Sequence, residues 1–236
     1  MRISEIRAAS LITKSGLPGT EFVINPYGGC SHACIYCYAR FMKRFSGHEE
    51  PWGKYVDVKI NAPELVPPAP AGLPGLEPAS PLTGRRVFMS SVTDPYLPQE
   101  RTYKLTRAIL ERLVPHQPFL GIQTKSALIT RDIDILTRFR DCEAGITITT
   151  LDDAVRREIE PATSSIQDRI SALETLKGAA LRTYVFIGPI IPGVTDWRSI
   201  IERTRHAVDF YNLENLNVTG SVKKSMADWY RDKHPE

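Results

Sequence analysis

Residues 25–40 read NPYGGCSHACIYCYAR, and they place three of the four cysteines of the chain, Cys30, Cys34 and Cys37, within eight positions. The two glycines before Cys30 let the backbone bend tightly. The spacings of four and three residues then allow one loop to turn three sulfurs toward a common centre. Soft thiolates bind zinc or iron–sulfur clusters in preference to magnesium or calcium. The stretch therefore predicts a metal site with three thiolate ligands.

Two kinds of metal site remain open on the residues alone. A structural zinc ion needs four ligands, so His32 or His48 would have to complete the set, and neither makes a known zinc-finger spacing. A four-iron cluster held by protein alone also needs four ligands, and the remaining cysteine, Cys142, is more than a hundred positions away. One iron would then lack a cysteine and could bind a small molecule.

Length and composition bound the class of protein. A chain of 236 residues with 42% hydrophobic and 24% charged residues predicts one globular domain over residues 1–236. The sequence has no apolar run of about eighteen residues, and its first ten residues, MRISEIRAAS, mix charges among few apolar side chains. We therefore expect a cytoplasmic protein without a membrane span or secretory signal. The formal net charge of +3 is far below that of a dedicated nucleic-acid binder.

Strand-like and helix-like stretches alternate along the chain. Six apolar or β-branched runs predict strands at Glu21–Asn25, Arg86–Ser91, Phe119–Gln123, Ala144–Thr149, Arg182–Gly188 and Asn215–Thr219. Helical spacing of apolar residues fills the gaps at Leu105–Leu113, Leu128–Phe139, Ile166–Leu176 and Trp197–Tyr211. Asp196 is a candidate N-cap, and Lys177-Gly178 is typical of a helix end. Six units favour an α/β fold, a partial (β/α)6 TIM-like barrel, with a doubly wound sheet as the alternative.

Two segments stand outside this alternation. Residues 67–84 carry six prolines, which predicts a loop or exposed linker. The C-terminal tail, residues 220–236, carries Lys223, Lys224, Trp229 and Tyr230 among its basic and aromatic side chains. Such residues could bind nucleic acid, but a solvated terminal helix is the favoured interpretation, because isolated basic residues without a groove seldom bind polyanions tightly.

A CxxxCxxC motif on the loop after the first strand of a partial (β/α)6 barrel resembles the radical S-adenosylmethionine (SAM) enzymes. Further motifs follow in order over residues 25–193 and resemble the spore photoproduct lyase-like, or DNA repair photolyase-like, branch: SSVTDPYLPQE, TKSALITRD, ITITTLDD, EPATSS and IGPIIPG. The resemblance implies a [4Fe-4S] cluster on the three cysteines, with SAM chelated at the open iron. It also implies reductive cleavage of SAM to a 5′-deoxyadenosyl radical that abstracts hydrogen from substrate, and a flavodoxin- or ferredoxin-like one-electron donor as partner.

The resemblance further assigns roles to residues at the strand ends. It implies that Lys125 pairs with the SAM carboxylate, that Thr93 and Asp94 accept from its amino group, and that Thr147 and Thr149 bind its ribose. Tyr36 would form a wall for the adenine, and the backbone near Ile190 would bind the adenine edge. Taken singly, each of these residues is more often an ordinary turn or solvated residue. Their common position at strand ends beside the cysteines favours function.

Four residues bear on the reaction itself. Tyr38 is a candidate relay for an electron or hydrogen atom, or a packed aromatic at a helix start. Glu100 is a candidate substrate contact, or a helix cap. Ser91 stands where similar lesion-repairing lyases have a hydrogen-donating cysteine, which counts against lesion repair unless Tyr36 or Tyr38 substitutes. Cys142 is expected to be a structural thiol.

The leading functional hypothesis is a radical SAM enzyme, with nucleic acid or a nucleotide as the favoured class of substrate. Two alternatives remain. One is a radical SAM enzyme that modifies a peptide or small molecule. The other is a non-catalytic binding module in which a metal only stabilises the fold.

Overall fold

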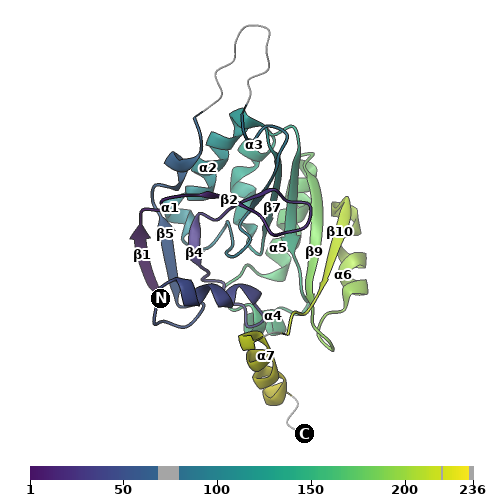
Figure 1. The fold of residues 1–236 in the computed structure, drawn as a ribbon. Coiled ribbons are helices and arrows are strands. Elements are labelled where there is room, and N and C mark those ends of the chain that lie inside the picture. Colours follow the sequence, from purple (N-terminus) through teal and green to yellow (C-terminus); the bar gives the residue numbers. More distant parts are fainter. Residues whose placement is uncertain (69–79, 219, 234–236) are drawn as a thin grey trace.

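The computed structural model describes residues 1–68, 80–218 and 220–233, and its centre is a seven-stranded sheet (Figure 1). Six strands pair in parallel and in sequence order, and a short antiparallel strand lies at one edge. From that edge the strands are β2 (Ile12–Lys14), β3 (Phe22–Ile24), β6 (Arg86–Met89), β7 (Phe119–Thr124), β8 (Cys142–Thr147), β9 (Arg182–Ile190) and β10 (Phe210–Asn215). Because the order never reverses, the sheet is wound as a partial (β/α)6 barrel, and the doubly wound alternative is wrong.

Helices cover the outer face of this sheet and its carboxyl end (Figure 1). The α-helices are α1 (Glu100–Tyr103), α2 (Leu105–Leu113), α3 (Ile133–Leu136), α4 (Asp153–Ile159), α5 (Ile166–Gly178), α6 (Trp197–Thr204) and α7 (Gly220–Lys233). The 3-10 helices are η1 (Tyr38–Phe45), η2 (Ala62–Leu65), η3 (Val114–His116), η4 (Ala127–Asp132) and η5 (Arg205–Ala207). No helix in the described ranges is both long and apolar enough to cross a membrane.

Five of the six predicted strands are found where the sequence placed them, but the sixth is wrong. The last strand, β10, covers Phe210–Asn215 rather than 215–219, and α6 ends at Thr204, so Tyr211 lies in a strand rather than in a helix. β10 is an edge strand whose residues are mostly exposed, so it shows no strong apolar alternation. The predicted helix over residues 128–139 is instead split between η4 and α3.

Two predicted helix ends are confirmed. The carboxylate of Asp196 accepts a hydrogen bond from the backbone N–H of Ser199 at 3.2 Å, which caps α6. Helix α5 ends at Gly178. Most of the proline-rich stretch, residues 69–79, lies outside the described residues.

A second, three-stranded sheet was not predicted. It consists of β1 (Arg2–Ile6), β5 (Tyr55–Lys59) and β4 (Tyr27–Gly29), with β5 in the centre, parallel to β1 and antiparallel to β4. It supports the cysteine loop, because β4 ends immediately before Cys30. Gly29 has φ +72°, and a Cβ there would lie 2.6 Å from the carbonyl oxygen of Tyr55, so only glycine fits at this bend.

The hydrophobic core has two parts that matter for the site. The larger lies between the seven-stranded sheet and its helices, and it holds Cys142, the first residue of β8. A smaller apolar cluster joins α7 to the cysteine loop through Val222 and Met226, which pack with Cys34 and Tyr36. The terminal segment is therefore a helix with one face packed against the cysteine loop and the other exposed to solvent.

Candidate active site

A cavity of about 950 Å³ lies on the face of the sheet opposite the helices. Alternate residues of the parallel strands line it, because successive side chains in a strand point to opposite faces. These include Phe88, Gln123, Thr147, Tyr184, Phe186 and Asn212. The cysteine loop contributes to the same cavity.

Cys30, Cys34 and Cys37 all line this cavity, and all are free thiols. Cys30 and Cys34 are buried, and Cys37 is partly exposed. Burial raises the pKa of Cys34 to about 12 and also raises the pKa values of the other two thiols. Metal binding requires thiolates, so a bound metal would have to supply the positive charge that compensates for this burial. A cationic cluster fits such a donor set.

Both histidines near the cysteines have carboxylate partners of their own. His32 Nδ1 lies 3.4 Å from Asp94 Oδ2, and His48 Nε2 lies 2.8 Å from Asp57 Oδ1. Each of the two candidate fourth ligands of a zinc ion therefore already has an acidic partner.

Asp94 is buried, and both of its carboxylate oxygens are held by the protein. Oδ1 accepts from Thr124 Oγ1 at 2.6 Å and from the N–H of Tyr96 at 2.8 Å, while Oδ2 accepts from the N–H of Lys125 at 3.0 Å. Although burial opposes ionisation, the charge of His32 and these hydrogen bonds lower the pKa of Asp94 to about 2. Asp94 thus fixes the backbone of Lys125.

Lys125 follows β7 and lines the cavity. Its Nζ lies 5.6 Å from the centre of the Tyr36 ring, and within the described part of the chain the ammonium has no carboxylate or hydrogen-bond partner. Burial lowers the pKa of Lys125, but the nearby charges of Cys34 and Glu160 outweigh it and raise the pKa above its usual value. The cavity therefore holds a cation that is available to an anionic ligand.

Tyr36 belongs to a buried network that the sequence analysis missed. Its hydroxyl donates to Glu160 Oε1 and lies 3.2 Å from Thr149 Oγ1, which also donates to Glu160 Oε1 at 2.9 Å. The other carboxylate oxygen of Glu160 pairs with Arg169 Nη2 at 2.5 Å. Glu160 is the first residue of the EPATSS motif, and the sequence of that motif alone does not show that its carboxylate would be buried.

The other predicted SAM contacts are divided between the cavity and its surroundings. Thr93 lines the cavity and donates to the carbonyl of Gly29 at 2.6 Å, and Thr147 lines it and accepts from Gln123 Nε2 at 3.3 Å. Ile190 packs against the main core instead, while its neighbours Gly188 and Pro189 reach the cavity.

Tyr38 and Ser91 both line the cavity, and the Tyr38 hydroxyl donates to the carbonyl of Ser91. Glu100, by contrast, does not line it. Its carboxylate is fully buried, accepts from the Tyr27 hydroxyl, and pairs with Arg131 Nη2 at 2.8 Å. The structure therefore places Tyr38 where a substrate could reach it and gives Glu100 a structural setting at the start of α1.

Solved structures of other proteins share the fold of this chain. No model of a known protein family matches the chain. Two solved structures of spore photoproduct lyase variants superpose with TM-scores of 0.67 and 0.64, the latter with bound AdoMet and dinucleoside spore photoproduct. They are 18% and 17% identical in sequence, and each match covers 99% of this chain and 66% of the lyase chain.

Two sequence relatives extend the comparison. The "Radical SAM Nalpha-GlyT isomerase" of Pseudomonas phage M6 is 26% identical over 182 residues, which are 75% of this chain and 35% of the phage protein. The "Uncharacterized protein MJ0683" of Methanocaldococcus jannaschii is 37% identical over 236 residues, which are 100% of this chain and 85% of the relative.

The barrel, with its cysteine loop after the first parallel strand, has the fold of the spore photoproduct lyases. The chain belongs to the family of the MJ0683 protein, and a more distant relative, the phage protein, is named a radical SAM enzyme.

Proposed function

We propose that Cys30, Cys34 and Cys37 hold a [4Fe-4S] cluster whose open iron binds SAM. The observation that carries this proposal is that three free thiols line the same cavity as Lys125, whose ammonium has no partner among the described residues. When bound, the reduced cluster would supply one electron for cleavage of the sulfonium–C5′ bond of SAM to methionine and a 5′-deoxyadenosyl radical, and that radical would take a hydrogen atom from the substrate.

The chain's own residues bind and orient SAM. Lys125 is the proposed partner of its carboxylate, because it lines the cavity, its ammonium has no partner among the described residues, and a charge-assisted hydrogen bond to a carboxylate is strong. Thr93 and Thr147 line the cavity and are the proposed contacts for its amino group and ribose. The Thr93 hydroxyl donates to the Gly29 carbonyl and can still accept, and the Thr147 hydroxyl accepts from Gln123 and can still donate. The backbone from Gly188 to Ile190 is the proposed contact for the adenine edge.

Three predicted SAM contacts take a positioning role. Asp94, Tyr36 and Thr149 have their polar atoms engaged within the protein. We assign them as positioning residues. Asp94 holds the backbone of Lys125, and the other two connect the cysteine loop to Glu160. Tyr36 and Asp94 also line the cavity, and the ring of Tyr36 keeps its proposed role as a wall for the adenine.

For the substrate we propose a nucleic acid or nucleotide. The fold shared with a lyase that binds a dinucleoside supports this class. Ser91 lacks the weak S–H bond of a cysteine, so the hydrogen-atom relay is assigned to Tyr38, whose hydroxyl reaches the Ser91 carbonyl. Tyr36 is less suited to that role, because its hydroxyl is bound to Glu160.

The test is anaerobic incubation of the reconstituted protein with dithionite and SAM, followed by chromatography for 5′-deoxyadenosine and methionine. We expect both products in a 1:1 ratio from the wild type and none from Cys30→Ala, Cys34→Ala or Cys37→Ala. Cys142→Ala is the matched control, because it removes a buried thiol from the main core rather than from the cavity, and it should retain most of the product. A wild type that holds its cluster but forms no product would contradict the proposal and favour a binding module.

A further inference from the structure

A second hollow lies beside the cysteine loop and is distinct from the cavity. It measures about 680 Å³ and is lined by Arg40, Phe41, Lys43, Arg44, Gly47 and His48. None of these residues lines the cavity that holds the proposed SAM site. We call it the η1 hollow, because η1 supplies most of its lining and begins directly after Cys37. A partner seated in it would leave the cavity free for SAM and substrate.

Three cations of the η1 hollow, Arg40, Lys43 and Arg44, have no carboxylate partner among the residues that the structure describes. Its histidine, His48, does have acidic neighbours, at 2.8 Å from Asp57 and 3.5 Å from Glu50. The ammonium of Lys43 donates to the carbonyl of Glu49 at 3.0 Å, and the Arg44 guanidinium lies 4.6 Å from the centre of the Phe45 ring. Neither contact neutralises the charge, so the surface attracts an acidic partner.

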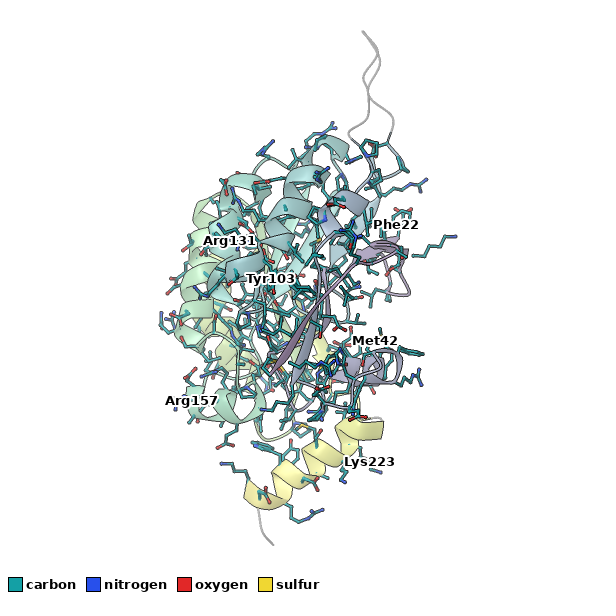
Figure 2. The ribbon with its side chains drawn as sticks, turned by 90° about the vertical axis from the view of Figure 1, so that its left-hand side faces the viewer. Phe22, Met42, Tyr103, Arg131, Arg157 and Lys223 are labelled. Carbon is teal, nitrogen blue, oxygen red and sulfur yellow. The ribbon has the colours of Figure 1, made fainter. Side chains whose placement is uncertain are left out.

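Exposed aromatic rings border these cations. Phe41 is 45% exposed and Phe45 is 66% exposed. An apolar contact flanked by charge is suited to a transient complex, because electron-transfer encounters bury little area and depend on electrostatic steering. Figure 2 shows η1, marked by Met42, above the first turn of α7, marked by Lys223, on the surface next to the cysteine loop.

One side chain connects the hollow to the cysteines. Arg40 lines the hollow, and its Nη2 donates to the carbonyl of Cys34 at 3.2 Å. A partner bound in the hollow is therefore separated from the cysteine loop by the length of a single side chain. Electron transfer requires such proximity, and the proposed SAM site lies in the cavity, which shares no lining residue with the hollow.

We propose that the η1 hollow docks an acidic one-electron carrier, which gives one electron to the cluster and is oxidised by one electron. This inference rests on the proposed function. A nucleic acid would be attracted by the same cations, but single strands bind along extended grooves. The hollow is confined to residues 40–48, which favours a compact protein surface.

The experiment compares two reductants on the reconstituted holoenzyme. A reduced bacterial flavodoxin serves as the acidic carrier, and its oxidation is followed by flavin absorbance in stopped flow; dithionite serves as the small reductant. The variant is Lys43→Glu/Arg44→Glu. The matched control is Arg112→Glu/Arg138→Glu, which reverses two exposed cations on α2 and just after α3, at the opposite end of the barrel (Figure 1).

We expect the Lys43→Glu/Arg44→Glu variant to accept electrons from flavodoxin about tenfold more slowly than the wild type at about 0.1 M ionic strength. The difference should shrink at about 1 M, where the Debye length falls to about 3 Å. Reduction by dithionite should be unchanged, and the control should behave as the wild type.

Three results would overturn the inference. The first is an equal rate of flavodoxin oxidation by the variant and the wild type. The second is a variant whose rate of reduction falls as much with dithionite as with flavodoxin. The third is a variant that binds a single-stranded oligonucleotide more weakly but accepts electrons from flavodoxin at the wild-type rate. Absence of SAM cleavage by the dithionite-reduced wild type would overturn the proposed function, and the inference with it. Failure of the proposed function can be told apart from failure of the docking inference, because the SAM-cleavage assay uses dithionite and no flavodoxin.

Discussion

Arg169 and Glu160 form an ion pair in which both side chains are fully buried, with Nη2 and Oε2 2.5 Å apart. The pair joins α5 to the residue that follows α4. The second carboxylate oxygen accepts from Tyr36 in the cysteine loop. One carboxylate therefore fixes the loop to two helices, and the position of the proposed cluster depends on it.

Glu160→Gln should destabilise the fold by about 3–5 kcal/mol, because it leaves the Arg169 guanidinium buried without its counter-charge. Urea denaturation at pH 7 measures this free energy. Glu158→Gln is the matched control two residues away: Glu158 pairs with Lys233 at the surface, and exposed pairs contribute about 0–1 kcal/mol. If the two substitutions lower the free energy of unfolding equally, the buried ion pair contributes no more to stability than the exposed one.

The same carboxylate makes stability depend on pH. Burial alone would raise the pKa of Glu160, but the charges of Arg169 and Lys125 outweigh it and lower the pKa to about 2. A lowered folded-state pKa contributes stability that is present above the unfolded value of 4.5 and is lost as the pH falls toward 2. The free energy of unfolding should therefore fall between about pH 4.5 and about pH 2, and less steeply in Glu160→Gln. Asp94 contributes in the same direction, so part of the slope should remain. Parallel slopes for the two proteins would refute the assignment.

Lys125→Met should weaken SAM binding by about 10- to 100-fold, because hydrogen bonds to charged groups contribute about 1.5–3 kcal/mol. Anaerobic equilibrium dialysis of the reconstituted protein measures the dissociation constant. Lys14→Met, at an exposed position in β2, controls for loss of a charge elsewhere. Unchanged SAM affinity in Lys125→Met would remove Lys125 from the proposed site.

The two tyrosines of the cysteine loop should respond differently to loss of their hydroxyls. Tyr36→Phe removes a hydrogen bond to the buried carboxylate of Glu160 and should cost about 1.5–3 kcal/mol. Tyr38 is 46% exposed and donates to a neutral carbonyl, so Tyr38→Phe should cost about 1 kcal/mol or less. Urea denaturation of the two variants makes the comparison, and a larger cost for Tyr38→Phe would contradict the separation of their roles.

The sequence predicted the barrel and the cysteine loop because both depend on local patterns. Five strands of the seven-stranded sheet, β3, β6, β7, β8 and β9, are apolar runs bounded by turn residues, and the three cysteines lie close together in the chain. β4 escaped detection because it is three residues long and contains Gly28 and Gly29, which have low strand propensity.

The buried charges could not be predicted in the same way. Glu160 and Arg169 belong to residue types that are almost never fully buried unless they are paired. In sequence they resemble a solvated helix face, and only the fold shows that they meet. Likewise, the polar residues at the strand ends were found by position, but the sequence could not show that Asp94 would be fully bonded within the protein while Lys125 would not.

Helix α7 gives the last prediction. Val222 and Met226 are four residues apart on one face of the helix, and they pack with Cys34 and Tyr36. The hydroxyl of Ser225 also donates to the carbonyl of Ile35 at 2.6 Å. The helix therefore covers the outer side of the cysteine loop and should limit access of solvent and oxygen to a bound cluster.

Met226→Ala should weaken this contact by about 2–5 kcal/mol, the usual cost of truncating a buried methionine to alanine. We expect faster loss of the cluster's visible absorbance when the reconstituted protein is exposed to air, and earlier cleavage within α7 by a protease. Lys224→Ala, on the exposed face of the same helix, should behave as the wild type. If Met226→Ala loses its cluster in air no faster than Lys224→Ala, then α7 does not shield the loop, and its packing serves the fold alone.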